Sequence, residues 1–169
     1  MKLSSGFTLL ELLITVVLVS IIMAIAVPSM REFTQNDRLT TNINTLIGHL
    51  NYARSEAVKR SQQVSICASN DAATCSGTWS DGWIVYIDAD ADNSFTAGEE
   101  IIRAQQSLEG GNTLTATGIG TQITYDYRGF VNAASVGSLQ LCDARSGPHG
   151  KTVNITTTGR VRLETDTSC

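Results

Sequence analysis

Histidine is scarce in this chain, with two among 169 residues, and the usual sequence signatures of catalysis are missing. There is no Gly-x-Ser-x-Gly of a serine hydrolase, no His-Glu-x-x-His of a zinc protease and no Cys-x-x-Cys pair. No Gly-x-Gly-x-x-Gly follows a candidate strand, so a nucleotide-binding loop is not expected. The sequence therefore argues against an enzyme and against a bound cofactor.

Charge is absent from a long stretch near the N-terminus, because Leu12 to Met30 holds 19 residues without an acid or a base. A helix of that length covers the roughly 30 Å of a bilayer's hydrocarbon core. Glu11 stands directly before the stretch, where a carboxylate costs about 2.5–3.5 kcal/mol in lipid unless it finds a cationic partner. We therefore expect a membrane-spanning helix over residues 7–28 and a functional role for Glu11.

The residues in front of this helix, Lys2 and Gly6-Phe7-Thr8-Leu9-Leu10-Glu11, resemble the N-terminal signature of type IV pilins and type II secretion pseudopilins. The resemblance implies that residues 1–6 are a leader, that a membrane prepilin peptidase cuts after Gly6, and that the new amine on Phe7 is methylated. It also implies that Glu11, the fifth residue of the mature chain, pairs with the N-terminal amine of a neighbouring pilin subunit during filament assembly.

Two plainer interpretations compete with the pilin leader. An ordinary secretory signal needs a small-x-small cleavage site, which Ala24-Ile25-Ala26 offers, but it does not explain Glu11 within the apolar region. A simple single-span anchor explains the length of the apolar stretch but neither Gly6 nor Glu11. The pilin interpretation accounts for all of these residues.

All four cysteines lie beyond the apolar stretch. Lys2 is the only base before the span, so we expect the leader end to stay in the cytoplasm and the remainder to be exported across the inner membrane, where disulfides persist. Four cysteines allow three pairings. We expect Cys67–Cys75 and Cys142–Cys169, the second of which would tie the C-terminus to an inner strand. A zinc site is the rival interpretation, which the missing Cys-x-x-Cys disfavours.

Helical periodicity continues past Pro28, which predicts a kinked but unbroken helix with an amphipathic second part over residues 29–61. After it the pattern changes to short β-branched or aromatic runs separated by turn residues. The expected strands are Val64–Cys67, Gly82–Asp88, Glu100–Gln105, Thr113–Ala116, Ile123–Tyr127, Ser138–Cys142, Lys151–Thr157 and Arg160–Glu164. The sequence thus predicts an α+β fold in which the long helix packs on the antiparallel sheet of one β-rich domain, residues 62–169.

The segment around the second expected strand also resembles a known family. Gly82-Trp83-Ile84-Val85-Tyr86-Ile87-Asp88, an Asp- and Asn-rich loop and Glu99-Glu100-Ile101-Ile102-Arg103 are similar to the body of the FimT/GspH family. These are minor pilins and pseudopilins that sit near filament tips. Together with the N-terminal signature, the resemblance implies a type IV pilin fold, and it leaves residues 107–143 without a motif.

The Asp- and Asn-rich loop fits the spacing of an EF-hand calcium loop. The ligand positions 1, 3, 5, 7, 9 and 12 are filled by Asp88, Asp90, Asp92, Ser94, Thr96 and Glu99. Position 6 is Asn93 rather than glycine, and strands rather than helices are expected on both sides. Asx residues also close hairpin loops without an ion. We therefore favour an ion-free connection, with Asp88, Asp90, Asp92 and Glu99 as the alternative metal site.

Acids are missing from one window of this chain, although 12 basic residues stand against 16 acidic ones overall. Between Ala144 and Leu163 the basic residues and histidine are Arg145, His149, Lys151, Arg160 and Arg162. Gly159-Arg160-Val161-Arg162-Leu163 predicts a turn into a strand, in which Val161 and Leu163 face the core and both arginines face solvent. The arginines would lie about 6.6 Å apart, near the spacing of neighbouring phosphates along an extended nucleic-acid strand.

Gly-Arg-x-Arg at this place resembles the DNA-binding motif of the FimT branch of the family, which implies capture of DNA in natural transformation. Gly159, Arg160 and Arg162 match the motif, while Arg145, His149 and Lys151 match only as nearby positive charge. A solvated strand face with two ordinary arginines is the plain alternative.

These observations and resemblances predict a minor pilin anchored in the inner membrane, with its C-terminal domain in the periplasm. It would assemble with other major and minor pilins into a pilus or pseudopilus at the cell surface, and bind single- or double-stranded DNA without sequence preference. The rival function is a structural minor pilin or pseudopilin that primes assembly of a type IV pilus or of a type II secretion pseudopilus.

Overall fold

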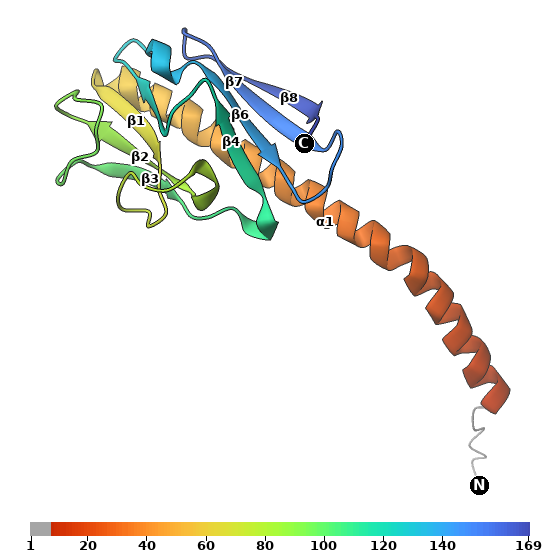
Figure 1. Ribbon diagram of the computed structural model, residues 1–169. Helices are drawn as coiled ribbons and strands as arrows, with labels where there is room; N and C mark the ends of the chain where they lie inside the picture. Colours follow the sequence, from red (N-terminus) through yellow and green to blue (C-terminus); the bar gives the residue numbers. More distant parts are fainter. Residues whose placement is uncertain (1–7) are drawn as a thin grey trace. The chain divides into compact units, whose positions relative to one another are not determined.

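One long helix opens the computed structural model, which describes residues 8–169 (Figure 1). α1 spans Leu9–Arg60 and passes through Pro28 without interruption. The chain divides into two compact units, residues 1–36 and residues 37–169. The second unit therefore contains the last part of α1 together with the residues that follow the helix.

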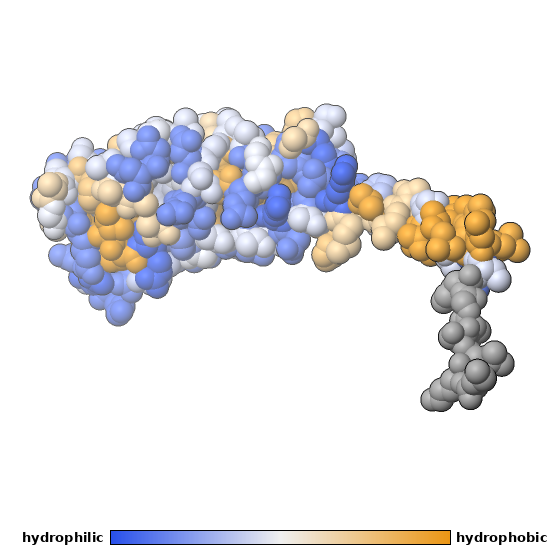
Figure 2. All heavy atoms as spheres, turned by 90° about the horizontal axis from the view of Figure 1, so that it is seen from below, coloured by the Kyte–Doolittle hydropathy of each residue, from blue (hydrophilic) through white to orange (hydrophobic). Residues whose placement is uncertain are grey.

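In the first unit α1 has no covered face. Every described residue from Thr8 to Thr34 is exposed, including large apolar side chains such as Leu10, Ile14 and Ile22. Figure 2 shows apolar side chains gathered on the surface of this part of the helix. Within residues 8–169, α1 alone is long and apolar enough to cross a bilayer. So much exposed apolar surface is unfavourable in water and favourable in hydrocarbon, as expected for a membrane anchor.

The second unit contains eight strands in two antiparallel sheets of four. The first sheet has the order β3-β2-β1-β5, and the second has the order β4-β6-β7-β8. The strands are β1 (Gln63–Ala68), β2 (Trp83–Asp88), β3 (Ile101–Gln105), β4 (Thr113–Thr117), β5 (Gln122–Tyr125), β6 (Gly137–Cys142), β7 (Gly150–Ile155) and β8 (Val161–Thr167). Three short 3-10 helices, η1 (Trp79–Asp81), η2 (Glu109–Gly111) and η3 (Ala133–Ser135), lie in the connections. All eight predicted strands are present, with bounds that differ by three residues at most.

The second half of α1 packs on the sheets through one face. Its buried residues recur at spacings of three and four, which places them in one stripe along the helix. They are Leu39, Ile43, Leu46, Leu50, Ala53, Glu56 and Ala57. The apolar members join inward side chains of both sheets in one hydrophobic core. This is the predicted α+β arrangement of a long helix on antiparallel sheets.

β2 is buried on both of its faces, and every one of its residues is buried. One face contributes to the core under α1, and the other forms a smaller cluster around Tyr86. Phe95, from the loop between β2 and β3, lies edge-on against Tyr86 with the ring centroids 5.0 Å apart. Phe95 therefore anchors that loop over the outer face of the first sheet.

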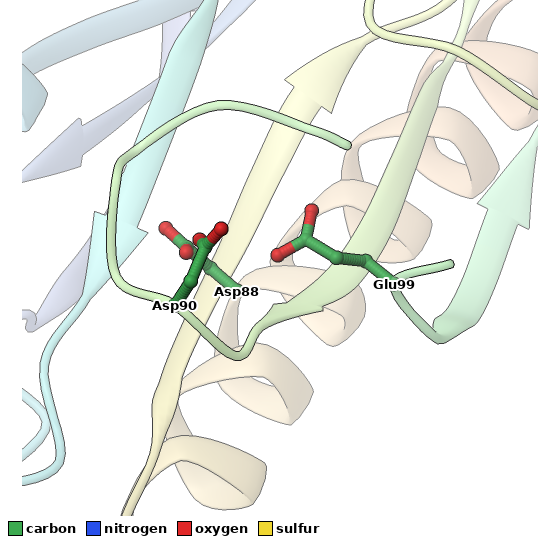
Figure 3. A group of neighbouring side chains, drawn as sticks. All are labelled: Asp88, Asp90 and Glu99. Carbon is green, nitrogen blue, oxygen red and sulfur yellow. The ribbon is translucent and has the colours of Figure 1, made fainter. Parts of the chain in front are cut away.

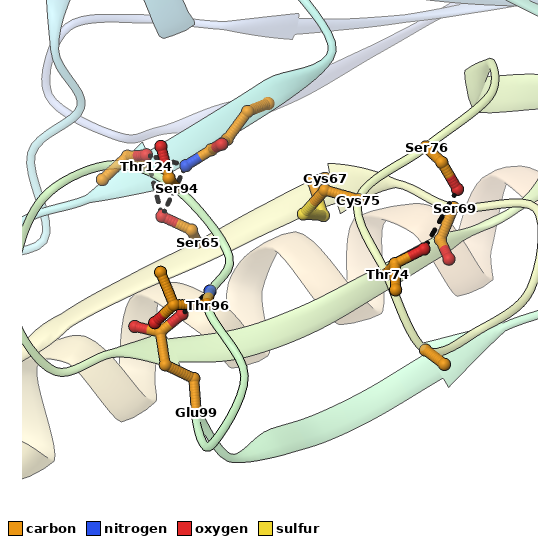
Figure 4. The surroundings of a disulfide bond; sticks show 12 residues. Ser65, Cys67, Ser69, Thr74, Cys75, Ser76, Ser94, Thr96, Glu99 and Thr124 are labelled. Atoms are coloured by element: carbon orange, nitrogen blue, oxygen red, sulfur yellow. Dashed lines mark hydrogen bonds between the residues drawn. A yellow bond between two sulfur atoms is a disulfide. The ribbon is translucent and has the colours of Figure 1, made fainter.

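The four cysteines form two disulfides, Cys67–Cys75 and Cys142–Cys169. The first ties β1 to the loop that follows it (Figure 4). The second ties the end of β6 to the last residue of the chain, just beyond the edge strand β8. These are the pairs expected from the sequence, and no free cysteine remains in the described chain for a zinc site.

Candidate nucleic-acid interface

The Gly-Arg-x-Arg segment closes the hairpin between β7 and β8. The N–H of Thr156 donates to the carbonyl oxygen of Arg160 at 3.1 Å, and the N–H of Gly159 donates to the carbonyl oxygen of Thr156 at 2.8 Å. β8 begins at Val161, so Arg160 is the last residue of the turn and Arg162 lies within the strand. The hydrogen bonds of the turn and of the strand therefore fix the backbone positions of both arginines.

Gly159 has a structural role in this turn. Its φ of 71° lies in the left-handed region that glycine adopts without strain. The residue is buried, and a Cβ there would collide with the carbonyl oxygen of Gly129 and lie 3.1 Å from Cε1 of Tyr125. Glycine is thus required because another loop lies against the turn on its inner side.

Arg160 and Arg162 are exposed on the same face of the second sheet. Arg162 lies opposite Asn154 of β7. Arg160 lies just before β8, but its carbonyl still accepts a hydrogen bond from the N–H of Thr156, so the alternation of the ladder extends to it and carries it to the same side. Neither arginine forms an ion pair with an acid of residues 8–169. Glu164 follows on this face two positions further along β8. The positive face is therefore confined to the turn end of the strand.

Burial in β8 differs from the sequence prediction at one position. Val161 is half-buried against the core, but Leu163 is 37% exposed. Leu163 lies opposite the buried Val153, so it faces the core side as predicted, but it is not covered there. β8 is the edge strand of its sheet and has a neighbour on one side only, so alternation by itself does not bury a face along its whole length.

Arg145 is engaged with an acid just outside the acid-free window. Its Nη2 lies 2.6 Å from Oδ2 of Asp143, its Nε donates to the same oxygen at 2.8 Å, and its side chain is only 17% exposed. Burial alone would raise the pKa of Asp143, but hydrogen bonds from Arg145 and the charge of His149 hold that pKa below its ordinary value. The carboxylate therefore stays ionised and neutralises Arg145.

The remaining predicted cations do not share the face of the arginine pair. Lys151 lies opposite Thr165, and it shares its side of β7 with the buried Val153 and Ile155. Arg145 and His149 precede β7, so a six-residue strand, about 20 Å at 3.3 Å per residue, separates them from the turn. The structure thus brings Arg160 and Arg162 together but does not bring Arg145, His149 or Lys151 to them.

A loop that the sequence analysis left without a motif, residues 126–130, lies against the turn. The N–H of Val131 donates to the carbonyl oxygen of Thr157 at 3.1 Å. Arg54 of α1 joins the two segments, because its Nε donates to the carbonyl of Gly129 at 3.0 Å and its Nη2 donates to the carbonyl of Thr158 at 3.0 Å. We call residues 126–130 and 156–162 together the turn surface.

The loop brings aromatic rings to the turn surface. Tyr127 is 58% exposed and Phe130 is 44% exposed, and the guanidinium carbon of Arg128 lies 5.3 Å and 5.6 Å from their ring centroids. Asp126 accepts hydrogen bonds from Nε of Arg128 at 3.0 Å and from its Nη2 at 2.8 Å. Arg128 therefore orders the loop more than it adds charge. The interleaved aromatic and basic run Tyr127-Arg128-Gly129-Phe130 is the sequence signal that could have identified this loop.

The Asp- and Asn-rich loop brings three of its four principal candidate ligands together. Carboxylate oxygens of Asp88, Asp90 and Glu99 lie within 4.8 Å of one another (Figure 3). Asp92 is not part of this group, and its carboxylate accepts a hydrogen bond from the N–H of Ser94 at 2.7 Å. This is the one group of acidic, histidine or cysteine side chains within residues 8–169 that is close enough to hold a metal ion.

At the N-terminus the expected processing site, Gly6 and Phe7, lies outside the described residues. Glu11 lies in the first turn of α1, where its N–H donates to Oγ1 of Thr8 at 3.2 Å. Its side chain is exposed at the start of the apolar stretch.

Comparison with known proteins gives two family matches and two related structures. The family described as Type II transport protein GspH matches residues 42–159, and the prokaryotic N-terminal methylation motif matches residues 1–27. A crystal structure of the type IV minor pilin FimU of Pseudomonas aeruginosa has a TM-score of 0.61 at 22% identity, covering 79% of this chain and 93% of that chain. FimU in a second crystal form has a TM-score of 0.58 at 21% identity, covering 76% and 94%. No curated protein matches significantly.

The two family matches cover different parts of the chain. The methylation motif covers Gly6, Phe7 and Glu11, and the GspH match covers the sheet-packed part of α1 and the strands up to the turn after β7. Family and fold are those of pilin-type structural proteins, not of enzymes. The chain belongs to the GspH family and is a minor pilin or pseudopilin of the GspH/FimT type.

Proposed function

We propose that this minor pilin binds DNA without sequence preference through Arg160 and Arg162 and assists DNA uptake in natural transformation. The observation that carries the proposal is the arginine pair itself, which is exposed, on one face and without an acidic partner in residues 8–169. Two positions along a strand correspond to about 6.6 Å. Guanidinium forks at that spacing suit the phosphate oxygens of successive nucleotides.

The loop of the turn surface extends the proposed contact beyond phosphates. Exposed aromatic rings stack on unpaired bases of any sequence, at about 1–3 kcal/mol per base. Tyr127 and Phe130 offer such rings beside the turn that carries Arg160. DNA with unpaired bases would gain contacts here that an intact duplex does not offer, so single-stranded DNA should bind at least as tightly as duplex.

The charge of the whole chain limits the expected affinity. Sixteen acidic residues against 12 basic ones oppose the approach of a polyanion, and only the local pair attracts it. Affinity should fall in the micromolar range or weaker that is typical of non-specific contacts at physiological salt, about 10⁻⁴–10⁻⁶ M. Weak binding suits a filament that must later release its cargo.

Anchoring and assembly complete the proposal. The first unit would span the inner membrane, with the leader in the cytoplasm until the prepilin peptidase cuts between Gly6 and Phe7 and the second unit in the periplasm. Glu11 would then pair with the N-terminal amine of a neighbouring pilin, since an unpaired carboxylate is costly within lipid. Assembly into a pilus would carry the turn surface to the cell exterior.

Replacing Arg160 and Arg162 together by glutamine should abolish DNA binding by the full-length protein in detergent micelles. With two phosphates contacted, log K of the parent should fall with log salt at a slope of about −1.4 to −1.8. The measurement is fluorescence anisotropy with labelled single-stranded and duplex DNA over a salt series. Folding should be unchanged, because exposed substitutions of this kind change stability by about 0.5 kcal/mol or less.

The matched control removes the same charge elsewhere. Arg31→Gln with Arg103→Gln also deletes two exposed arginines, neither of which belongs to the turn surface. This variant should retain parental affinity and slope. Equal binding by the Arg160→Gln/Arg162→Gln protein and the parent, or no salt-sensitive binding by the parent, would refute the proposal.

A purely structural role in assembly is the second candidate. The observation that favours it is the extent of the GspH match, which ends at residue 159, just before the two arginines. The part of this chain that matches the family is then the fold without the arginine pair. In addition, Glu164 lies on the same face of β8 as Arg162 and reduces the local positive charge. On this alternative the protein primes assembly of a pilus or a secretion pseudopilus from the filament tip and binds no DNA.

A further inference from the structure

The loop between β2 and β3 gathers negative charge without a cation. Asp88 is the last residue of β2, and Asp90 and Glu99 approach it from the two ends of the loop (Figure 3). No lysine, arginine or histidine of residues 8–169 forms an ion pair with any of the three. Carboxylates this close repel one another unless a proton or a cation lies between them.

Asp88 gives the loop a property that an ordinary acidic surface cluster lacks. Its side chain is buried, with 1% of the residue exposed. Its Oδ2 accepts hydrogen bonds from Nε2 of Gln63 at 2.8 Å and from the N–H of Asn93 at 3.0 Å. Its Oδ1 is equally buried but has no hydrogen-bond partner in the described chain. An unpartnered buried carboxylate oxygen carries a large desolvation cost, which a bound cation would offset.

The surrounding backbone already holds the loop closed around these oxygens. Glu99 accepts a hydrogen bond from the N–H of Ala89 on Oε1 at 3.1 Å and one from the N–H of Thr96 on Oε2 at 2.8 Å. Phe95 fixes the middle of the loop on Tyr86. The carboxylates are therefore positioned before any ligand arrives.

The sequence objection to an EF-hand-like site was the absence of glycine at position 6. Asn93 occupies that position with φ of 63°, in the left-handed region that asparagine tolerates better than other non-glycine residues. The turn that glycine would permit is therefore made without it. The preference for an ion-free connection, which rested partly on this residue, loses that support.

We propose that Asp88, Asp90 and Glu99 bind one calcium ion, which fastens the β2–β3 loop to the end of β2. The donors are all oxygens, which suit a hard cation and disfavour zinc. They fall at positions 1, 3 and 12 of the EF-hand spacing. Calcium accepts the irregular geometry and the additional water ligands that three carboxylates leave, whereas magnesium demands a near-ideal octahedron.

The affinity should resemble that of extracellular calcium modules, about 10⁻⁴–10⁻³ M. In the full-length protein in detergent, about 10 mM calcium chloride should then raise the melting temperature of the β-rich unit by about 4–8 °C over an EGTA-treated sample. The same concentration of magnesium chloride should raise it far less. Isothermal titration with calcium chloride should give one site per chain.

Two variants separate a site from a general salt effect. Asp90→Asn removes the charge of an exposed ligand and keeps the oxygen that accepts from the N–H of Asp92. It should abolish the calcium response and leave the EGTA melting temperature unchanged or slightly higher, because one repelling charge is gone. Asp166→Asn removes the same charge from β8, far from the loop in the sheet order, and should respond to calcium like the parent. A parent that melts at the same temperature with calcium and with EGTA, or an Asp90→Asn protein that keeps the full response, overturns the proposal.

Discussion

Replacing Gly159 by alanine should destabilise the β-rich unit by about 2–6 kcal/mol. About 1–3 kcal/mol arises because a non-glycine residue must adopt the left-handed φ of 71°. About as much again arises because the new Cβ would displace the carbonyl of Gly129. That carbonyl cannot retreat freely, since Arg54 donates a hydrogen bond to it at 3.0 Å. Urea unfolding of the two proteins measures the difference.

Gly120 provides the matched control for this substitution. It is exposed, has no positive φ, and a Cβ added there meets no atom within 4 Å. Gly120→Ala should therefore change stability by about 0.5 kcal/mol or less. If Gly159→Ala unfolds at the parental denaturant midpoint, the turn does not rest on loop 126–130 as described. If Gly159→Ala strongly destabilises the unit, a loss of DNA binding in that variant arises because the turn has moved. Such a loss is then no evidence that Gly159 itself contacts a phosphate.

Loss of the Cys142–Cys169 disulfide should cost about 3–4 kcal/mol, because the bridge closes a loop with a sequence separation of 27. Cys142→Ala with Cys169→Ala also releases the C-terminal end of β8, an edge strand that has only β7 beside it. Arg162 lies at the opposite, turn end of β8, so affinity for DNA should fall as far as fraying spreads along this edge strand from its released end. Thermal unfolding and the anisotropy assay measure the two effects on the same protein.

The other disulfide separates these two effects. Cys67–Cys75 has a sequence separation of 8 and lies in the first sheet, so Cys67→Ala with Cys75→Ala should lower stability but leave DNA binding intact where the protein is still folded. Unchanged stability of the Cys142→Ala/Cys169→Ala protein, or free thiols in the exported parent, would contradict the role given to the C-terminal bridge.

Local pattern was sufficient to predict the elements but not their pairing. β1 was expected over Val64–Cys67 and spans Gln63–Ala68, because β-branched residues and the turns around them are local signals. The division into two sheets was not predictable in the same way. β1 pairs with β5 across the whole of the intervening β2–β4 segment, and such long-range pairing depends on how α1 and the sheets share one core.

The exposure of single side chains in the candidate site could be predicted from the sequence, but which residues lie next to one another could not. The arginines of Gly-Arg-x-Arg were expected to be exposed and they are. Lys151 was grouped with the two arginines because it is close to them in the sequence. It lies two residues before the buried Val153 in the same strand, and this spacing already indicated the face opposite to that of Arg162. The partner of Arg145 is Asp143, which stood one residue outside the acid-free window. The loop at Arg128 has a local aromatic and basic signal, but its position against the turn depends on long-range contacts that the sequence pattern does not contain.

Uptake of labelled DNA by cells that produce full-length Arg160→Gln/Arg162→Gln protein in place of the parent tests the central claim most directly. The Arg31→Gln/Arg103→Gln protein serves as the charge-matched control, and the number of filaments per cell is counted in each strain. A DNA-binding minor pilin predicts normal filaments with uptake as low as in cells lacking the protein, and parental uptake in the control strain. Parental uptake with the Arg160→Gln/Arg162→Gln protein would contradict DNA binding and leave filament assembly as the function.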